Sequence, residues 1–136
     1  MKTGFDILEK VYKIINVSGI TSKIGGRIYR RAKPPNRQLQ DIVVLTLPIM
    51  GSPDVQTSTV IINIYCINNQ YGLSDETKLN TITDAVITVL EAYNQQSDGS
   101  YFDFDLNNSS ENTMLDTDQP IMSYTSLRVV CNIQKK

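Results

Sequence analysis

The chain has no histidine among its 136 residues. Histidine is the commonest general base and the commonest metal ligand in proteins, so its absence removes the usual Ser-His and Cys-His nucleophile pairs as well. We therefore expect a protein that is not an enzyme and that needs neither a metal nor a cofactor.

Cysteine is scarce, with only Cys66 and Cys131 in the sequence. Each lies inside an apolar, β-branched run and not in a loop with the spacing of metal ligands. The pattern predicts two buried free thiols. A disulfide would require that the two strands are neighbours and present both side chains on one face.

Long apolar runs are missing too. No stretch of 18 apolar residues occurs, and residues 1–9 carry acids where a signal peptide needs an apolar stretch. We expect a soluble cytoplasmic protein without a membrane segment. A length of 136 residues and 40% hydrophobic content predict a single domain over residues 1–136.

Charge is unevenly distributed, although the net charge is only -1. Residues 23–37 contain no acid, and residues 98–118 contain no base. The basic segment comprises Lys23, Arg27, Arg30, Arg31, Lys33 and Arg37, and the acidic segment comprises Asp98, Asp103, Asp105, Glu111, Asp116 and Asp118. We expect one basic and one acidic region on the folded surface.

Two segments have the periodicity of amphipathic helices. In residues 5–15 the apolar positions follow helical spacing, and in residues 74–93 they do so through about five turns, after Ser74 as a predicted N-cap. The predicted core faces are Phe5, Leu8, Val11, Tyr12 and Ile15 in the first helix, and Leu79, Ile82, Ala85, Val86, Val89, Leu90 and Tyr93 in the second.

Strands are predicted at residues 27–31, 41–49, 55–68, 101–106 and 121–134. The order α-β-β-β-α-β-β predicts an α+β fold, with a mainly antiparallel sheet of about five strands and both helices on one face. Residues 33–37 should form an exposed loop, and residues 107–120 a long mobile loop. The polar start of residues 55–68 should project from the body, and Val43, Leu45 and Ile61 should leave some apolar surface for association.

The charged residues allow more than one interpretation. The basic segment places Tyr29 among arginines, which suits a solvated loop, an assembly surface or contact with nucleic-acid phosphates. The pairs Asp103 with Asp105 and Asp116 with Asp118 could suggest catalytic acids or a calcium loop, but the second pair lacks the glycine and glutamate of an EF-hand. Structural or solvated roles are therefore favoured for these acids.

The run Ile24-Gly25-Gly26-Arg27-Ile28-Tyr29, followed by Pro34, a strand hairpin over residues 41–68 and an amphipathic helix over residues 74–93, resembles the tail-terminator and minor-tail proteins of long-tailed bacteriophages and prophages. The resemblance covers nearly the full chain. It implies a structural virion protein that forms a ring, usually a hexamer, which ends the tail tube and joins it to the head-side connector.

In that setting the expected partners are further copies of the chain, the tail-tube protein, the connector proteins and, in a lumen, DNA contacted without sequence preference. A closed ring needs two unlike patches on each subunit, and the basic and acidic segments are a candidate pair. Two alternatives stay open. One is a head-completion (neck) protein of the same virion, and the other is a small nucleic-acid-binding regulator.

Overall fold

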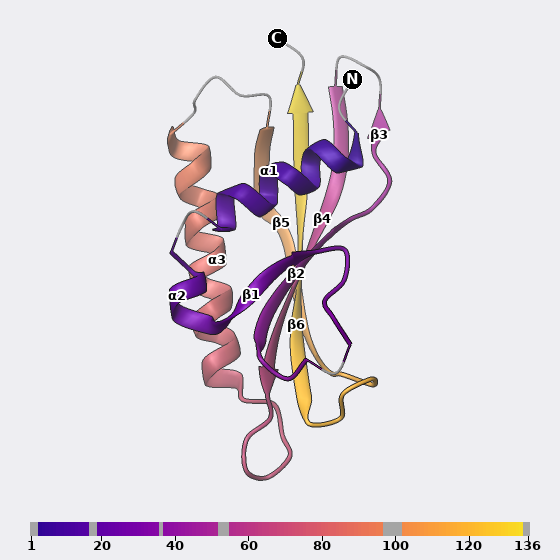
Figure 1. Cartoon of the computed structure of the whole chain (residues 1–136). Helices are drawn as coiled ribbons and strands as arrows, with labels where there is room; N and C mark the ends of the chain where they lie inside the picture. Colours follow the sequence, from indigo (N-terminus) through magenta and orange to yellow (C-terminus); the bar gives the residue numbers. More distant parts are fainter. Residues whose placement is uncertain (1–2, 17–18, 36, 52–54, 97–101, 135–136) are drawn as a thin grey trace.

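One mixed sheet and two long helices make up the computed structural model, which describes residues 3–16, 19–35, 37–51, 55–96 and 102–134 (Figure 1). The sheet has the strand order β1-β2-β4-β6-β5, with the two-residue β3 beside β4. The strands are β1 (Gly25–Arg30), β2 (Gln40–Thr46), β3 (Met50–Gly51), β4 (Val55–Ile67), β5 (Phe102–Leu115) and β6 (Met122–Gln134). The helices are α1 (Gly4–Asn16), α2 (Thr21–Ile24) and α3 (Glu76–Gln96). The predicted α+β class is confirmed.

Helix α1 begins with a capping box. The Thr3 amide donates to the Asp6 carboxylate at 2.8 Å, and the Asp6 amide donates to the Thr3 hydroxyl at 3.3 Å, so two helix-start donors are satisfied. Ile7, Leu8, Val11 and Ile15 form the buried face. The prediction that Phe5 belongs to the core was wrong, because its side chain is 74% exposed. Phe5 lies in the first turn, where its ring contacts the Arg31 guanidinium, and Ile7 takes the core position.

Helix α3 begins one residue later than predicted. Asp75 is its N-cap, since the Asp75 carboxylate accepts a hydrogen bond from the Lys78 amide at 3.2 Å. The predicted cap, Ser74, instead donates its hydroxyl hydrogen to Ser123 of β6 at 2.9 Å. The predicted core face is otherwise confirmed, with Leu79, Ile82, Val86 and Leu90 buried and Ala85, Val89 and Tyr93 packed against them.

The centre of the sheet is the antiparallel pair β4 and β6, which stays in register from Val55↔Gln134 to Ile67↔Met122. The sequence had suggested that the polar start of β4 projects from the body. This prediction was wrong, because that part of β4 pairs with β6 along its whole length. Gln56 and Ser58 are buried, and the Ser58 hydroxyl satisfies its hydrogen bonding with the Leu47 carbonyl at 3.0 Å and the Thr46 hydroxyl at 2.7 Å.

Most of the predicted loop at residues 107–120 is strand. β5 continues to Leu115, with an irregularity between Asp105 and Ser110 and regular pairing to β6 on both sides of it. The backbone of β6 offers a row of donors and acceptors, and these hold a polar segment in the sheet without any apolar alternation. The turn that remains covers residues 116–121, where Asp116 accepts a hydrogen bond from the Asp118 amide at 3.0 Å.

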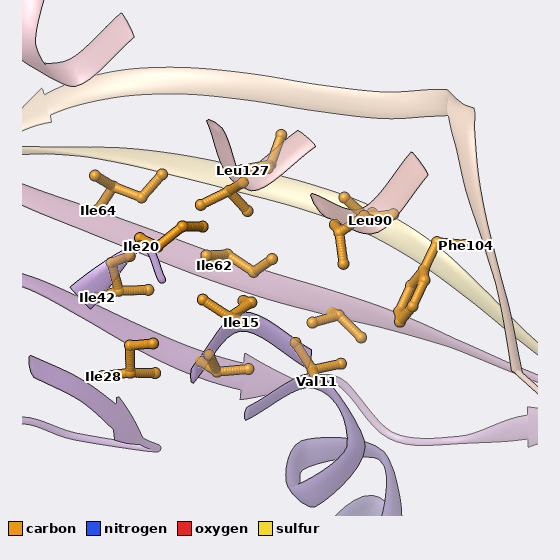
Figure 2. Close-up of a cluster of buried hydrophobic side chains, with 14 of the residues drawn as sticks. Val11, Ile15, Ile20, Ile28, Ile42, Ile62, Ile64, Leu90, Phe104 and Leu127 are labelled. Atoms are coloured by element: carbon orange, nitrogen blue, oxygen red, sulfur yellow. The ribbon is translucent and has the colours of Figure 1, made fainter. Parts of the chain in front are cut away.

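The core lies between the helices and one face of the sheet, which we call the helix face. Figure 2 shows Val11 and Ile15 of α1 and Leu90 of α3 pointing toward strand residues such as Ile42, Ile62 and Leu127. Helix α1 crosses the strands near one end of the sheet, whereas α3 runs roughly along them (Figure 1). Within the described residues no helix is both long and apolar enough to cross a membrane.

Both cysteines are buried free thiols on this face, as predicted. Cys66 lies on β4, whereas Cys131 on β6 pairs with Ser58, which is eight residues away from Cys66 along β4. Eight residues of strand span about 26 Å, far beyond the reach of a disulfide.

The opposite face of the sheet, which we call the loop face, is crossed by the chain between β1 and β2. Because β1 and β2 are parallel neighbours, this connection must return along the sheet before β2 can begin. The crossover segment, residues 31–39 apart from residue 36, starts at Arg31, which has a positive φ of 71°. Its path over the sheet buries Val43, so that the predicted apolar surplus is reduced to the half-buried Leu45 and Ile61.

Candidate assembly surfaces

Asp41, at the start of β2, holds β1 and the crossover segment together. Its carboxylate is fully buried, accepts the Arg27 amide hydrogen at 2.8 Å and pairs with Nε of Arg37 at 2.8 Å. Gly26 is required for this approach, because a Cβ there would overlap the Gln40 backbone and lie 2.6 Å from the Asp41 carboxylate. The Arg37 guanidinium also lies over the Tyr29 ring, 5.4 Å from its centroid.

The sequence predicted an exposed loop over residues 33–37. Pro34 and Pro35 are indeed exposed, but Lys33 and Arg37 are half-buried structural residues. Lys33 is half-buried over the Tyr65 ring, 4.0 Å from its centroid, and its ammonium donates to the Arg37 carbonyl at 3.2 Å. Burial lowers the pKa of Lys33, while the nearby Asp116 and Asp41 act in the opposite direction. The same surroundings raise the pKa of Tyr65 to about 12, with burial as the main cause and Asp116 next.

The basic and acidic segments were predicted to meet between subunits, but some of their residues meet within one chain. Lys33 of the basic segment and Asp116 of the acidic segment line one cleft of about 500 Å³ on the loop face, together with Arg31, Asn63, Tyr65 and Asp118. Asp116 is itself buried. Lys33 and Asp116 thus link the crossover segment to the turn at residues 116–121, and they are not available to a neighbouring molecule in the way that exposed charges are. Arg31 and Asp118 line the same cleft but stay exposed.

The remaining basic residues stay at the surface. Arg27, Arg30 and Arg31 are exposed, and the last two lie over aromatic rings of α1, at 5.1 Å from the Tyr12 centroid and 4.8 Å from the Phe5 centroid. At exposed sites such cation–π contacts contribute only about 0.5–1 kcal/mol, so both guanidinium groups can still contact other molecules. The Lys23 side chain is not among the described groups, although its backbone belongs to α2.

The remaining acidic residues lie mostly on β5. Asp103 and Glu111 are exposed, and Asp105 is half-buried. Asp103 and Asp105 share the loop face, as predicted from strand alternation, while Glu111 pairs with Leu127 and so belongs to the helix face. Asp118 is exposed in the turn, and Asp98 lies outside the described residues.

The two outer strands of the described sheet consequently carry opposite charges. β1, with Arg27 and Arg30, forms one edge, and β5, with Asp103 and Glu111, forms the other. Sequence reasoning found the charges but not their placement at opposite edges, because it left Glu111 in a loop. An edge strand presents unpaired backbone groups to a neighbour, so each edge is a candidate binding surface.

One end of the molecule exposes large apolar side chains. The connection at residues 68–75 and the turn at residues 116–121 lie together at this end (Figure 1), and the Asn68 amide donates to the Ile121 carbonyl at 2.8 Å. We define the apolar end as the exposed side chains Ile67, Tyr71, Leu73, Leu115 and Ile121, of which Tyr71 is 76% exposed and Leu73 is 63% exposed.

A second cleft, of about 470 Å³, separates α3 from the distal part of β5. Its lining is polar and rich in threonine, with Glu76 and Glu111 at its sides and a buried Thr83 hydroxyl that has no hydrogen-bond partner. Among the described residues, cysteine, aspartate and glutamate side chains form no group of three or more that could hold a metal ion.

We expect the buried thiol of Cys131 to make the free energy of unfolding fall at alkaline pH. Burial, with a smaller contribution from Asp103, raises the pKa of its thiol from 9.0 to about 12. The unfolded chain releases this proton near pH 9 and the folded chain keeps it until about pH 12, so this contribution to stability is complete below pH 9 and is lost as the pH rises.

We therefore expect Cys131→Ala to weaken the alkaline loss of stability. Between neutral pH and about pH 11, urea unfolding should show that the wild type loses about 3 kcal/mol more than the variant. Tyr65 and Lys33 titrate in both proteins, so the difference isolates the thiol. Equal pH dependence in the two proteins would contradict the prediction.

The chain matches none of the protein-family models against which it was scanned, and a search of curated proteins returns no similar sequence.

Proposed function

We propose that the chain is a structural protein that assembles with copies of itself into a ring, as tail terminators of long-tailed phages do at the end of the tail tube. The observation that carries the proposal is the apolar end. It exposes five large apolar side chains, from Ile67 at 46% to Tyr71 at 76%, while the helix face of the sheet has a closed core. A monomer gains nothing from such a patch, and patches of this kind mark association sites.

The shape of the sheet supports a ring in particular. A closed cyclic assembly needs two unlike surfaces on each subunit that meet head to tail. The described sheet ends in two unlike edges, one basic and one acidic, on opposite sides of the subunit. The apolar end lies at the ends of the strands and not along an edge, so it is placed to contact a neighbour above or below the ring (Figure 1).

The exposed arginines suit the same role. Arg27, Arg30 and Arg31 would be repeated around a ring by its symmetry, and they could contact a neighbouring subunit or the phosphates of DNA passing through. Neither contact reads a base sequence. A domain with an overall pI of about 5.3 also lacks the general positive field of a dedicated nucleic-acid regulator.

The test has two parts, self-assembly and attachment to tails. Light scattering over a range of concentrations and electron microscopy should show a cyclic oligomer, and the protein should bind purified tail tubes of its phage. We expect Tyr71→Ser combined with Leu73→Ser to reduce tube binding at least about tenfold while the oligomer persists, because hydrophobic anchors dominate such contacts.

The matched control is Phe5→Ser, which removes an aromatic ring of similar exposure, 74% against 76% for Tyr71, from a site outside the apolar end. It should leave tube binding unchanged. A wild-type chain that remains monomeric at every concentration and joins no tail or neck particle would contradict the proposed function.

A further inference from the structure

The distal half of β5 is an unprotected sheet edge. From Ser110 to Leu115 every residue is exposed, on both faces of the strand, and the segment contains neither lysine nor proline. Natural edge strands are usually shielded by such residues or by a covering element. The first half of β5 is shielded: the Asn94 side chain of α3 donates to the Phe104 carbonyl at 2.6 Å and accepts the Phe104 amide hydrogen at 3.1 Å.

The contact with Asn94 also fixes which backbone groups point outward. The Phe104 amide and carbonyl point away from β6, because both bond to Asn94. Phe104 and Cys131 are opposite each other and are not hydrogen-bonded to one another, so the Cys131 amide and carbonyl point toward β4. Alternation along β6 gives Leu127 and Thr125 the same direction as Cys131. Their partners Glu111 and Thr113 must then direct their amides and carbonyls away from β6, toward an incoming strand.

At the other edge of the sheet, β1 also has alternate residues whose backbone groups point outward. The Arg31 amide donates to the Val44 carbonyl of β2, at 2.8 Å, so the amides of Arg30 and Ile28 point away from β2. Arg30 is in register with Val44 and Ile28 with Ile42, both core residues, so Arg30 and Ile28 belong to the helix face, as Glu111 and Thr113 do.

We propose that the edge of β1 in one subunit adds to the distal edge of β5 in the next, with Arg30 opposite Glu111 and Ile28 opposite Thr113. This inference rests on the proposed self-assembly and names its lateral interface. β1, β2 and β6 run in one direction, and β4 and β5 run in the opposite direction. A second subunit that continues the sheet with its helices on the same side therefore places its β1 antiparallel to β5 of the first.

Length and charge identify a second copy of the chain as the occupant. β1 has six residues, and the exposed part of β5, residues 110–115, has the same length. The exposed Arg30 guanidinium and the exposed Glu111 carboxylate meet on one face in this register, so each subunit supplies both halves of a head-to-tail contact.

Charge reversal tests the pairing. Arg30→Glu and Glu111→Arg should each raise the concentration needed for half-maximal assembly about tenfold or more, because each sets like charges opposite one another. The two changes combined in one chain should restore assembly. Asp103→Arg is the matched control, since it makes the same charge change on the shielded half of β5, and it should assemble as the wild type does. Thermal unfolding of each variant below its assembly concentration checks that the subunit is folded.

Cysteine cross-linking gives an independent readout. A chain with Arg30→Cys and Glu111→Cys should form a ladder of disulfide-linked oligomers on oxidation, and a mixture of the two single variants should form linked dimers that contain one of each. The wild type, which has only the buried Cys66 and Cys131, gives the background level of cross-linking.

If the wild type assembles but the single reversals assemble equally well and no cross-links form, the ring uses another surface and this inference is wrong, while the proposed function stands. If Glu111→Arg weakens only tube binding, the edge receives a strand of another protein and the inference is likewise wrong. A monomeric wild type would contradict both.

Discussion

Replacing Gly26 with alanine should lower the free energy of unfolding by about 3 kcal/mol, because the added Cβ has no space. It would overlap the carbonyl group of Gln40 and lie 2.6 Å from Oδ1 of Asp41. Backbone atoms of a neighbouring strand cannot rotate away as a flexible side chain can, so β1 must separate from β2. The hydrogen bond from the Arg27 amide to Asp41 would be lost with that movement. Urea unfolding monitored by circular dichroism measures the effect.

The adjacent glycine is the control. Gly25 has a φ of 68°, and a Cβ added there would meet no heavy atom within 4 Å, so Gly25→Ala meets only the strain of the left-handed conformation, about 1 kcal/mol. If both substitutions cost the same, close packing of β1 on Asp41 is not the reason that glycine is present at position 26.

Asp41→Ala should also cost about 3 kcal/mol, because it leaves buried donors without an acceptor. The carboxylate is fully buried, whereas the Arg37 side chain retains 24% exposure, so water can compensate the arginine in part but not the Arg27 amide. The free energy of unfolding is again the quantity to measure. The variant should also lose the order of the crossover segment, which hydrogen exchange of the Arg31, Ala32 and Lys33 amides can follow.

Asp41→Asn separates the two contributions. It keeps an oxygen that can accept the Arg27 amide hydrogen but removes the charge that pairs with Arg37, so we expect a smaller loss, about 1–2 kcal/mol. A double-mutant cycle with Arg37→Met should give a clear coupling energy. Equal costs for Asp41→Ala and Asp41→Asn, with no coupling to Arg37, would contradict the role assigned to this carboxylate.

Both long helices and most strands could be predicted from the sequence because their apolar positions repeat locally. Leu79, Ile82, Val86 and Leu90 lie on one face of α3 whatever the rest of the chain does. The distal half of β5 could not be predicted. Residues 110–115 are exposed on both faces, so no alternation marks them, and they are strand only because β6 provides a pairing edge.

The charged segments were recognised from composition, but composition does not tell which charges are exposed. Arg37 and Lys33 could not be told from Arg27 and Arg30 without knowing that β1 and β2 are parallel. That pairing depends on Gly26 meeting Gln40 and Asp41, fourteen or more positions along the chain. An acid at the start of an apolar run looks like a solvated strand end, and nothing local to Asp41 reveals its partners.

The position of β6 in the sheet has a consequence for synthesis of the protein. β6 follows every other described strand along the chain, yet it lies between β4 and β5. On the ribosome, β4 must wait with one apolar strand edge uncovered while α3 and β5 are made, which takes several seconds at about 5–20 residues per second. Since β5 reaches the sheet through its pairing with β6, the acidic edge of the subunit forms only after β6 has been inserted.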